Sequence, residues 1–132
     1  MIFMLDTNII IYAKNKNPEG VLNKLSQYKR EDVCISVITM AELEYGTLKS
    51  SRPDKNRSAL MKFLTGIQII PFYPDAARLY GIIRNDLEKK GLIIGNNDML
   101  IAAQALSLDL TLITNNQREF ERIQNLKLEN WV

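Results

Sequence analysis

Short apolar runs alternate with stretches of helical periodicity along the whole chain, and this alternation constrains the fold more than any other feature. Four runs have the length and composition of buried strands: "IFML", "DVCISV", "QIIPF" and "LTLIT". A last edge strand is expected within "LKLENW". Because strands separated by helices pair in parallel and need cover on both faces, the pattern predicts an α/β fold with a short parallel sheet between two layers of helices.

Capping signals predict where the first helices begin. We expect Asn8 to cap a helix over residues 9–15, and Thr39 to cap one over residues 40–49. Pro18 suits the first turn of a helix over residues 19–29. The polar segment "SSRPDKNRS", with Pro53, is expected to form a loop before a helix over residues 59–67.

The second half of the chain has clearer boundaries. A long amphipathic helix is expected over residues 75–90, because lysines fill its last turn and Gly91 follows. An almost wholly apolar helix is expected over residues 99–106, and a short turn or helix over residues 115–123.

The length of 132 residues suits one domain with a substantial hydrophobic core, so we expect residues 1–132 to fold as a single unit. No apolar run is long enough to span a membrane and no targeting segment is recognisable, which favours a cytoplasmic location. The formal net charge of +2 permits a nucleic-acid partner without requiring one.

The chain contains no histidine, and Cys34 is its one cysteine. These two facts exclude a Ser-His-Asp triad and a Cys-His pair, and they argue against a structural zinc site. Cys34 lies in an apolar run and is expected to be a buried core residue. An enzyme built on this chain must therefore use carboxylates, lysines, hydroxyls or a hard metal ion.

Three acidic residues are predicted to meet at one edge of the sheet. Asp6 follows the first strand, Glu42 follows the second within a helix, and Asp98 lies just before the apolar helix that leads to the fourth. Because carboxylates at close range repel one another, a hard divalent ion such as Mg²⁺ or Mn²⁺ would stabilise the group. A metal-bound water could then attack a phosphodiester.

Each acid also has a purely structural interpretation. Taken alone, Asp98 is a helix cap, and Glu42 is half of a capping box with Thr39. Spacing alone does not distinguish Glu42 from Glu44, two positions on. The coincidence of three acids at strand ends is what favours a metal site, because capping does not predict it.

Four motifs, taken together and in order, resemble the VapC-type toxins of the PIN-domain family: "MLDTNIIIY", "SVITMAELEYG", "GLIIGNNDMLIAAQALSL" and "LITNNQREFERI". The resemblance implies a PIN-domain-like three-layer sandwich and a Mg²⁺-dependent endoribonuclease that cuts RNA needed for translation, often tRNA. It also implies a cognate VapB-type antitoxin, operator DNA bound through that antitoxin, and a toxin homodimer. It assigns the family's acids to Asp6, Glu42 and Asp98, which decides for Glu42 over Glu44.

The fourth acidic position of many family members is occupied here by Asn115 and Asn116, with Glu119 nearby. This departure favours one metal ion over two. Asn116 is a candidate for holding a metal-bound water, whereas Glu119 is interpreted as a solvated turn residue. Arg84, Lys14 and Arg118 are candidate contacts for RNA phosphates.

Two alternatives to a nuclease remain open. "GNNDMLIAA" and "LDTN" also look like motifs of haloacid-dehalogenase-type phosphatases, although Asn8 stands where those enzymes need a second aspartate. The other alternative is a catalytically weak module that only binds the antitoxin. For the nuclease, the predicted products carry a 5′-phosphate and a 3′-hydroxyl, because water and not the ribose 2′-hydroxyl is the nucleophile.

Overall fold

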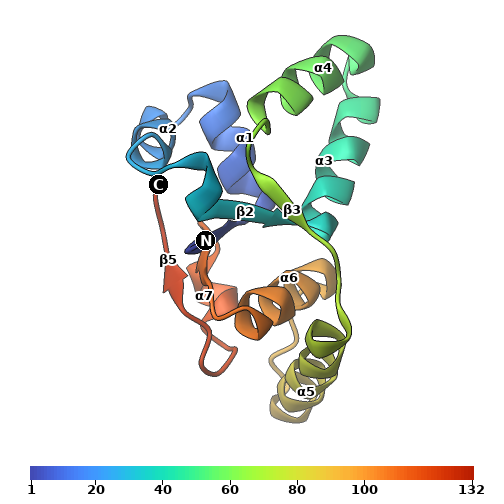
Figure 1. Ribbon diagram of the computed structural model, residues 1–132. Coiled ribbons are helices and arrows are strands. Elements are labelled where there is room, and N and C mark those ends of the chain that lie inside the picture. The colour runs from blue at the N-terminus through green and yellow to red at the C-terminus, as the bar shows by residue number, and fades with distance from the viewer.

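All 132 residues are described by the computed structural model, in which a five-stranded sheet lies between two groups of helices (Figure 1). Every pair of neighbouring strands is parallel, and the strand order is β3-β2-β1-β4-β5. The strands are β1 (Phe3–Leu5), β2 (Val33–Ser36), β3 (Gln68–Ile70), β4 (Thr111–Ile113) and β5 (Leu128–Glu129). The predicted parallel sheet is confirmed, including its edge strand.

Seven α-helices cover the sheet. In Figure 1, α1 to α4 lie above the strands, and α5, α6 and α7 lie below them. Their bounds are α1 (Thr7–Asn15), α2 (Glu19–Leu25), α3 (Val37–Lys49), α4 (Pro53–Phe63), α5 (Pro74–Lys90), α6 (Asn96–Ser107) and α7 (Gln117–Phe120), with a 3₁₀ turn η1 (Arg30–Asp32) before β2. The three-layer α/β architecture is therefore confirmed. None of these helices combines the length and apolar composition that crossing a membrane requires.

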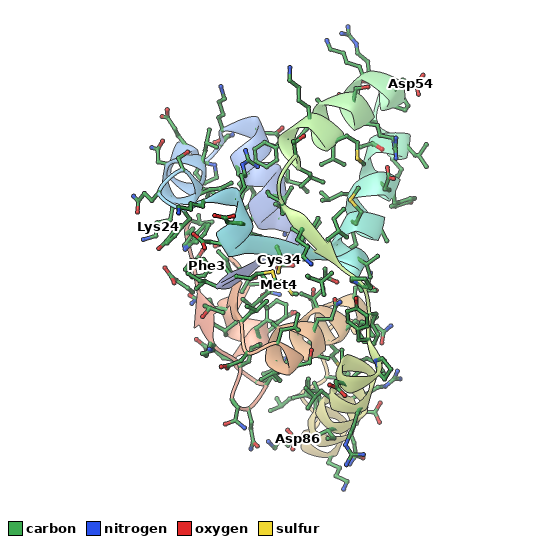
Figure 2. The ribbon with its side chains drawn as sticks, in the orientation of Figure 1. Phe3, Met4, Lys24, Cys34, Asp54 and Asp86 are labelled. Carbon is green, nitrogen blue, oxygen red and sulfur yellow. The ribbon has the colours of Figure 1, made fainter.

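The strands are apolar on both faces because each face packs on its own helical layer. Phe3 and Leu5 belong to the core under α1 to α4, whereas Met4 belongs to the core against α5 and α6. Cys34 accompanies Met4, and Figure 2 shows both side chains at the centre of the molecule. Cys34 is fully buried as expected, and burial raises the pKa of its thiol to about 12.

Two predicted caps are wrong, and both errors have the same cause. Asp6 caps α1, where its Oδ1 accepts a hydrogen bond of 2.8 Å from the Thr7 N–H. Ser36 caps α3, where its Oγ accepts a bond of 2.9 Å from the Ile38 N–H. In both places the helix starts immediately after the strand, so the capping residue lies earlier in the chain than Asn8 or Thr39. Thr39 thus lies inside α3, and no capping box forms with Glu42.

Three other helix boundaries also differ from the prediction. The segment expected to be a loop forms the first two turns of α4, because Pro53 occupies the first helical position, where its fixed φ is favourable. Helix α6 begins at Asn96, three residues earlier than predicted, with Gly95 before it. Helix α2 ends at Leu25, earlier than predicted, and Pro18 precedes it instead of lying in its first turn.

Candidate active site

The three predicted acids lie near one another at the carboxyl ends of the central strands. Asp6 directly follows β1, Glu42 lies in the second turn of α3, and Asp98 lies in the first turn of α6. The pKa of the Asp98 carboxyl is raised to about 6, mainly by burial and then by the negative charges of Asp6, Glu42 and Glu119, in that order. We call these four residues the acidic edge.

Asp6 is the most enclosed acid, with only 7% of its surface exposed. Its Oδ1 accepts the Thr7 N–H, and its Oδ2 accepts the Thr114 hydroxyl at 2.8 Å. Burial is the main reason that the pKa of Asp6 is raised, and the charge of Glu42 adds to it, although the two hydrogen bonds act in the opposite direction. These bonds fix the orientation of the carboxylate.

Thr7 also orients Glu42. The Thr7 hydroxyl donates to Glu42 Oε1 at 2.6 Å, and the buried Thr39 hydroxyl lies 3.3 Å from the same Thr7 oxygen. Thr7 thus contacts one acid with its backbone and another with its side chain. This role of Thr7 was not predicted from the sequence, although a hydroxyl residue directly after a strand-end aspartate is a signal that could have indicated it.

Glu44 is separated from the acidic edge. Both of its carboxylate oxygens accept hydrogen bonds from Arg57 of α4, at 2.7 Å and 2.9 Å. The bonds and charge of Arg57 lower the pKa of Glu44. The geometry therefore distinguishes Glu42 from Glu44, which spacing alone could not do.

The residues after β4 divide into two groups. Asn116 Nδ2 donates to Glu119 Oε2 at 3.0 Å, and the Asn116 N–H donates to Thr114 Oγ1. Asn115 is exposed and accepts a hydrogen bond from Asn130 instead. The interpretation of Glu119 as a solvated turn residue is wrong, because its charge acts on Asp98 and Asn116 holds its carboxylate.

Asp98 differs from the other acids because its carboxylate accepts no hydrogen bond. No side chain caps α6, so the structure does not support the interpretation of Asp98 as a capping residue. The carboxylate lies over Gly95, where an added Cβ would stand 3.4 Å from Asp98 Oδ2. Asp98 and Glu42 line an open recess of about 350 Å³ together with Gly95, Asn96 and Asn97, so solvent and ligands can reach both carboxylates.

No positive side chain neutralises the acidic edge. The four ion pairs of the protein include none of its carboxylates. As the side chains stand, no three of them are arranged to hold an ion together. The donor set nevertheless fits a hard divalent cation, because it offers only oxygen ligands and like charges, and because Asp98 has no hydrogen bond to break before it turns.

The three candidate phosphate contacts lie on three different helices. Arg84 of α5 pairs with Glu88 at 2.8 Å and donates to the Tyr80 hydroxyl at 2.9 Å. That hydroxyl donates in turn to the Asn96 amide oxygen, at the border of the recess. Lys14 lies on α1 and Arg118 on α7, and neither forms an ion pair within the chain.

Comparisons with known proteins agree with this architecture. The model of the PIN domain family matches residues 3–126. Ribonuclease VapC2 from Rickettsia felis is 51% identical over 132 residues, covering 99% of this chain and 98% of that protein. The tRNA(fMet)-specific endonuclease VapC from Salmonella typhimurium is 38% identical over 129 residues, covering 98% of this chain and 97% of that protein.

A solved structure has the same fold over the whole chain. The crystal structure of VapBC2 from Rickettsia felis, bound to a DNA fragment from their promoter, matches with a TM-score of 0.92 and 48% identity, covering 100% of both chains. These matches give no support to the phosphatase alternative. Nucleases with a PIN domain generally depend on a divalent metal ion, as the acidic edge leads one to expect. The chain belongs to the PIN-domain family and, within it, to the VapC-type ribonucleases of toxin–antitoxin systems.

Proposed function

We propose that this protein is an endoribonuclease toxin that cuts RNA with Mg²⁺ at the acidic edge, and that Mn²⁺ can replace Mg²⁺. The observation that carries the proposal is the gathering of four carboxylates with no cation among them. These carboxylates would hold the phosphate that is cut only when a metal ion neutralises their charge. The names of the VapC relatives support the ribonuclease activity.

Asp6, Asp98 and Glu42 are the residues that would hold the ion. When bound, Mg²⁺ lowers the pKa of water and stabilises charge on the phosphoryl oxygens. Asp6 is oriented in advance by its two hydrogen bonds, whereas Asp98 is free to turn toward a ligand. Glu42 would hold the ion or take a proton from the attacking water, and the Thr7 hydroxyl fixes the orientation of its carboxylate for either role.

Asn116 stands at the sequence position where many family members have their fourth acid, and Glu119 lies three residues further on. One of its amide hydrogens bonds Glu119, so the amide is held beside the acidic edge, where it can orient the attacking water. A neutral residue at this position favours a single metal ion. With water as the nucleophile, the products carry a 5′-phosphate and a 3′-hydroxyl.

The proposed substrate is tRNA, because one relative is named a tRNA(fMet)-specific endonuclease. We propose that Lys14, Arg118 and Arg84 contact its phosphates. The proposed inhibitor is a cognate VapB-type antitoxin, through which the pair would bind operator DNA, as the promoter-bound VapBC2 complex suggests. We further propose a homodimer in the cytoplasm.

The test is cleavage of total small RNA by the purified protein with Mg²⁺, with Mn²⁺ and with EDTA. Asp98→Asn should abolish cleavage, while Glu44→Gln should cut like the wild type, because Glu44 lies outside the acidic edge. A 2′,3′-cyclic phosphate among the products would contradict the mechanism. Metal binding without cleavage would favour the module that only binds the antitoxin.

A further inference from the structure

A cavity of about 320 Å³ opens among α1, α3 and α4, directly beside the acidic edge. Glu42 lines this cavity and also lines the recess that contains Asp98. A ligand in the cavity therefore lies next to the carboxylates that would act on the scissile phosphate. We call this space the α1–α3–α4 cavity.

The lining of the α1–α3–α4 cavity combines an apolar floor with a polar rim. Ile10, Leu43 and Leu60 are buried beneath it. Lys14, Asn15 and Asn56 stand around it, and their side chains form no hydrogen bond or ion pair within the protein. Each asparagine amide offers a donor and an acceptor side by side, in the arrangement that the edge of a nucleobase can pair with.

The size of the cavity also fits this ligand. Its volume lies at the lower end of the range of about 300–1,000 Å³ that is usual for small-ligand pockets, which suits one flat heterocycle. Proteins that read single-stranded RNA stack its splayed-out bases on aromatic or arginine side chains and bond the base edges. In this cavity the aliphatic floor would take the place of the planar side chain. Lys14 is the one basic residue of the lining, and it could contact a phosphate attached to such a base.

We propose that the α1–α3–α4 cavity binds one unpaired base of the RNA, next to the phosphate that is cut. This inference rests on the proposed nuclease function and adds a place where the RNA sequence is read. An apolar side chain from a protein partner fits the floor equally well, but it would make no use of Lys14, Asn15 and Asn56, whose polar groups would stay with water. A base satisfies both parts of the lining.

Gly46 offers a way to fill the cavity without disturbing the fold. It lies in α3, one turn after Glu42, and it lines the cavity. A Cβ built there meets no atom within 4 Å, and leucine favours helix more than glycine does. Gly46→Leu should therefore fold and place its side chain in the cavity. Gly81 in α5 is equally open but lies in the opposite layer, so Gly81→Leu is the matched control.

The experiment measures binding of a fluorescein-labelled single-stranded RNA decamer of mixed sequence, and of the same decamer in a duplex, by fluorescence anisotropy in EDTA. Gly46→Leu should weaken single-strand binding about tenfold, the scale of one stacked base, while Gly81→Leu should bind like the wild type. Duplex binding should be unchanged in both variants, because its bases are not available. In Mg²⁺, Gly46→Leu should also change the bases found beside the cut.

Equal affinities of Gly46→Leu and the wild type for the single strand would overturn the proposal. So would a Gly46→Leu protein that keeps RNA binding but resists a peptide from the antitoxin, because a protein side chain would then be the occupant. If Gly46→Leu does not fold, as judged by circular dichroism, the double variant Asn15→Ala/Asn56→Ala decides in the same way, with a loss of several-fold expected. Binding is measured without metal, so its result does not depend on whether the protein cuts RNA. A protein that binds the single strand but does not cut RNA would contradict the proposed function and not the proposed base-binding cavity.

Discussion

The two helical layers each supply a carboxylate to the acidic edge, but they position it differently. In the layer of α1 to α4, the Thr7 hydroxyl bonds Glu42 directly, and a cavity lies beside it. In the layer of α5 to α7, nothing bonds the Asp98 carboxylate, but its helix is firmly held. One layer thus orients the side chain and leaves space for a ligand, and the other fixes the helix and leaves the side chain free.

Gln104 is the residue that holds α6. It is 1% exposed, its Oε1 accepts the Ser36 hydroxyl, and its Nε2 donates to the carbonyls of Ile70 and Pro71 at 3.1 Å and 3.0 Å. Because Ser36 also caps α3, one buried amide connects the helix of Asp98 to the start of the helix of Glu42. The two layers are therefore joined directly at the carboxyl end of β2.

Among the residues that position the acids without being acids themselves, the largest effect is expected from removing the Thr7 hydroxyl, which orients Glu42. Thr7→Val keeps the shape of the residue and its N–H bond to Asp6, but it leaves Glu42 Oε1 without a donor. We expect cleavage to fall about 10- to 100-fold, as is typical for residues that orient metal ligands. Thr7→Ser should restore most of the activity because it keeps the hydroxyl. Steady-state cleavage of a labelled tRNA measures both, and full activity of Thr7→Val would show that the bond to Glu42 is not needed.

The second prediction concerns the layer that holds Asp98. Gln104→Leu leaves the buried Ser36 O–H without an acceptor and removes the side-chain donor to the Ile70 carbonyl, so the free energy of unfolding should fall by about 2 kcal/mol. Gln68→Leu is the control, because Gln68 is exposed on β3. Urea denaturation measures both variants. Equal stability of the two would mean that the buried amide does not join the layers.

The apolar pattern predicted all five strands and the layers, because burial on both faces of a parallel sheet leaves a clear signal in residues such as Leu5 and Ile35. The helix starts were less predictable. Asp6 and Ser36 end their strands and begin their helices at once, and local signals favoured the polar residues slightly further on. Tertiary context decided between two acceptable caps.

Strand-end position in the sequence predicts that Asp6, Glu42 and Asp98 lie together. Position could not show that Glu44 faces Arg57, since this depends on where α4 lies over α3. It also could not show Glu119 at the acidic edge, because the orientation of α7 depends on Phe120 being buried in the core. The order of the helices and strands can be predicted from one sequence, but the side-chain contacts between them cannot.

A third prediction follows from the raised pKa of Asp98. Without divalent ions, the folded carboxyl binds its proton up to pH of about 6, whereas the unfolded one releases it near 3.8. The folded state therefore loses stability as the pH rises from 4 through 6. Asp98→Asn removes this pH-dependent loss of stability. After allowance for solvent screening, the Tm of Asp98→Asn at pH 8 should exceed that of the wild type by roughly 2–4 °C. At pH 4 the two proteins should have the same Tm.

The control for this measurement is Asp54→Asn, because Asp54 also lies in the first turn of a helix but is exposed and has no acidic cluster around it. Figure 2 shows it at the far end of the upper layer. It should not raise the Tm at pH 8. Differential scanning fluorimetry from pH 4 to 8 in EDTA tests both variants, and a Tm of Asp98→Asn below that of the wild type at pH 8 would contradict the repulsion inferred here. Added Mg²⁺ should raise the Tm of the wild type and leave that of Asp98→Asn unchanged.

The smallest effect is expected from the ion pair between Glu44 and Arg57, which connects α3 to α4 on the outside of the upper layer. Both side chains are well exposed, so the attraction between their charges is screened by water and offset by the ordering of two long side chains. Arg57→Gln should therefore leave the Tm and the cleavage rate unchanged within error, at 50 mM and at 500 mM NaCl. Because α3 and α4 also border the α1–α3–α4 cavity, a loss of RNA affinity in Arg57→Gln would show that this pair, and not the apolar floor of Leu43 and Leu60, sets the width of that cavity.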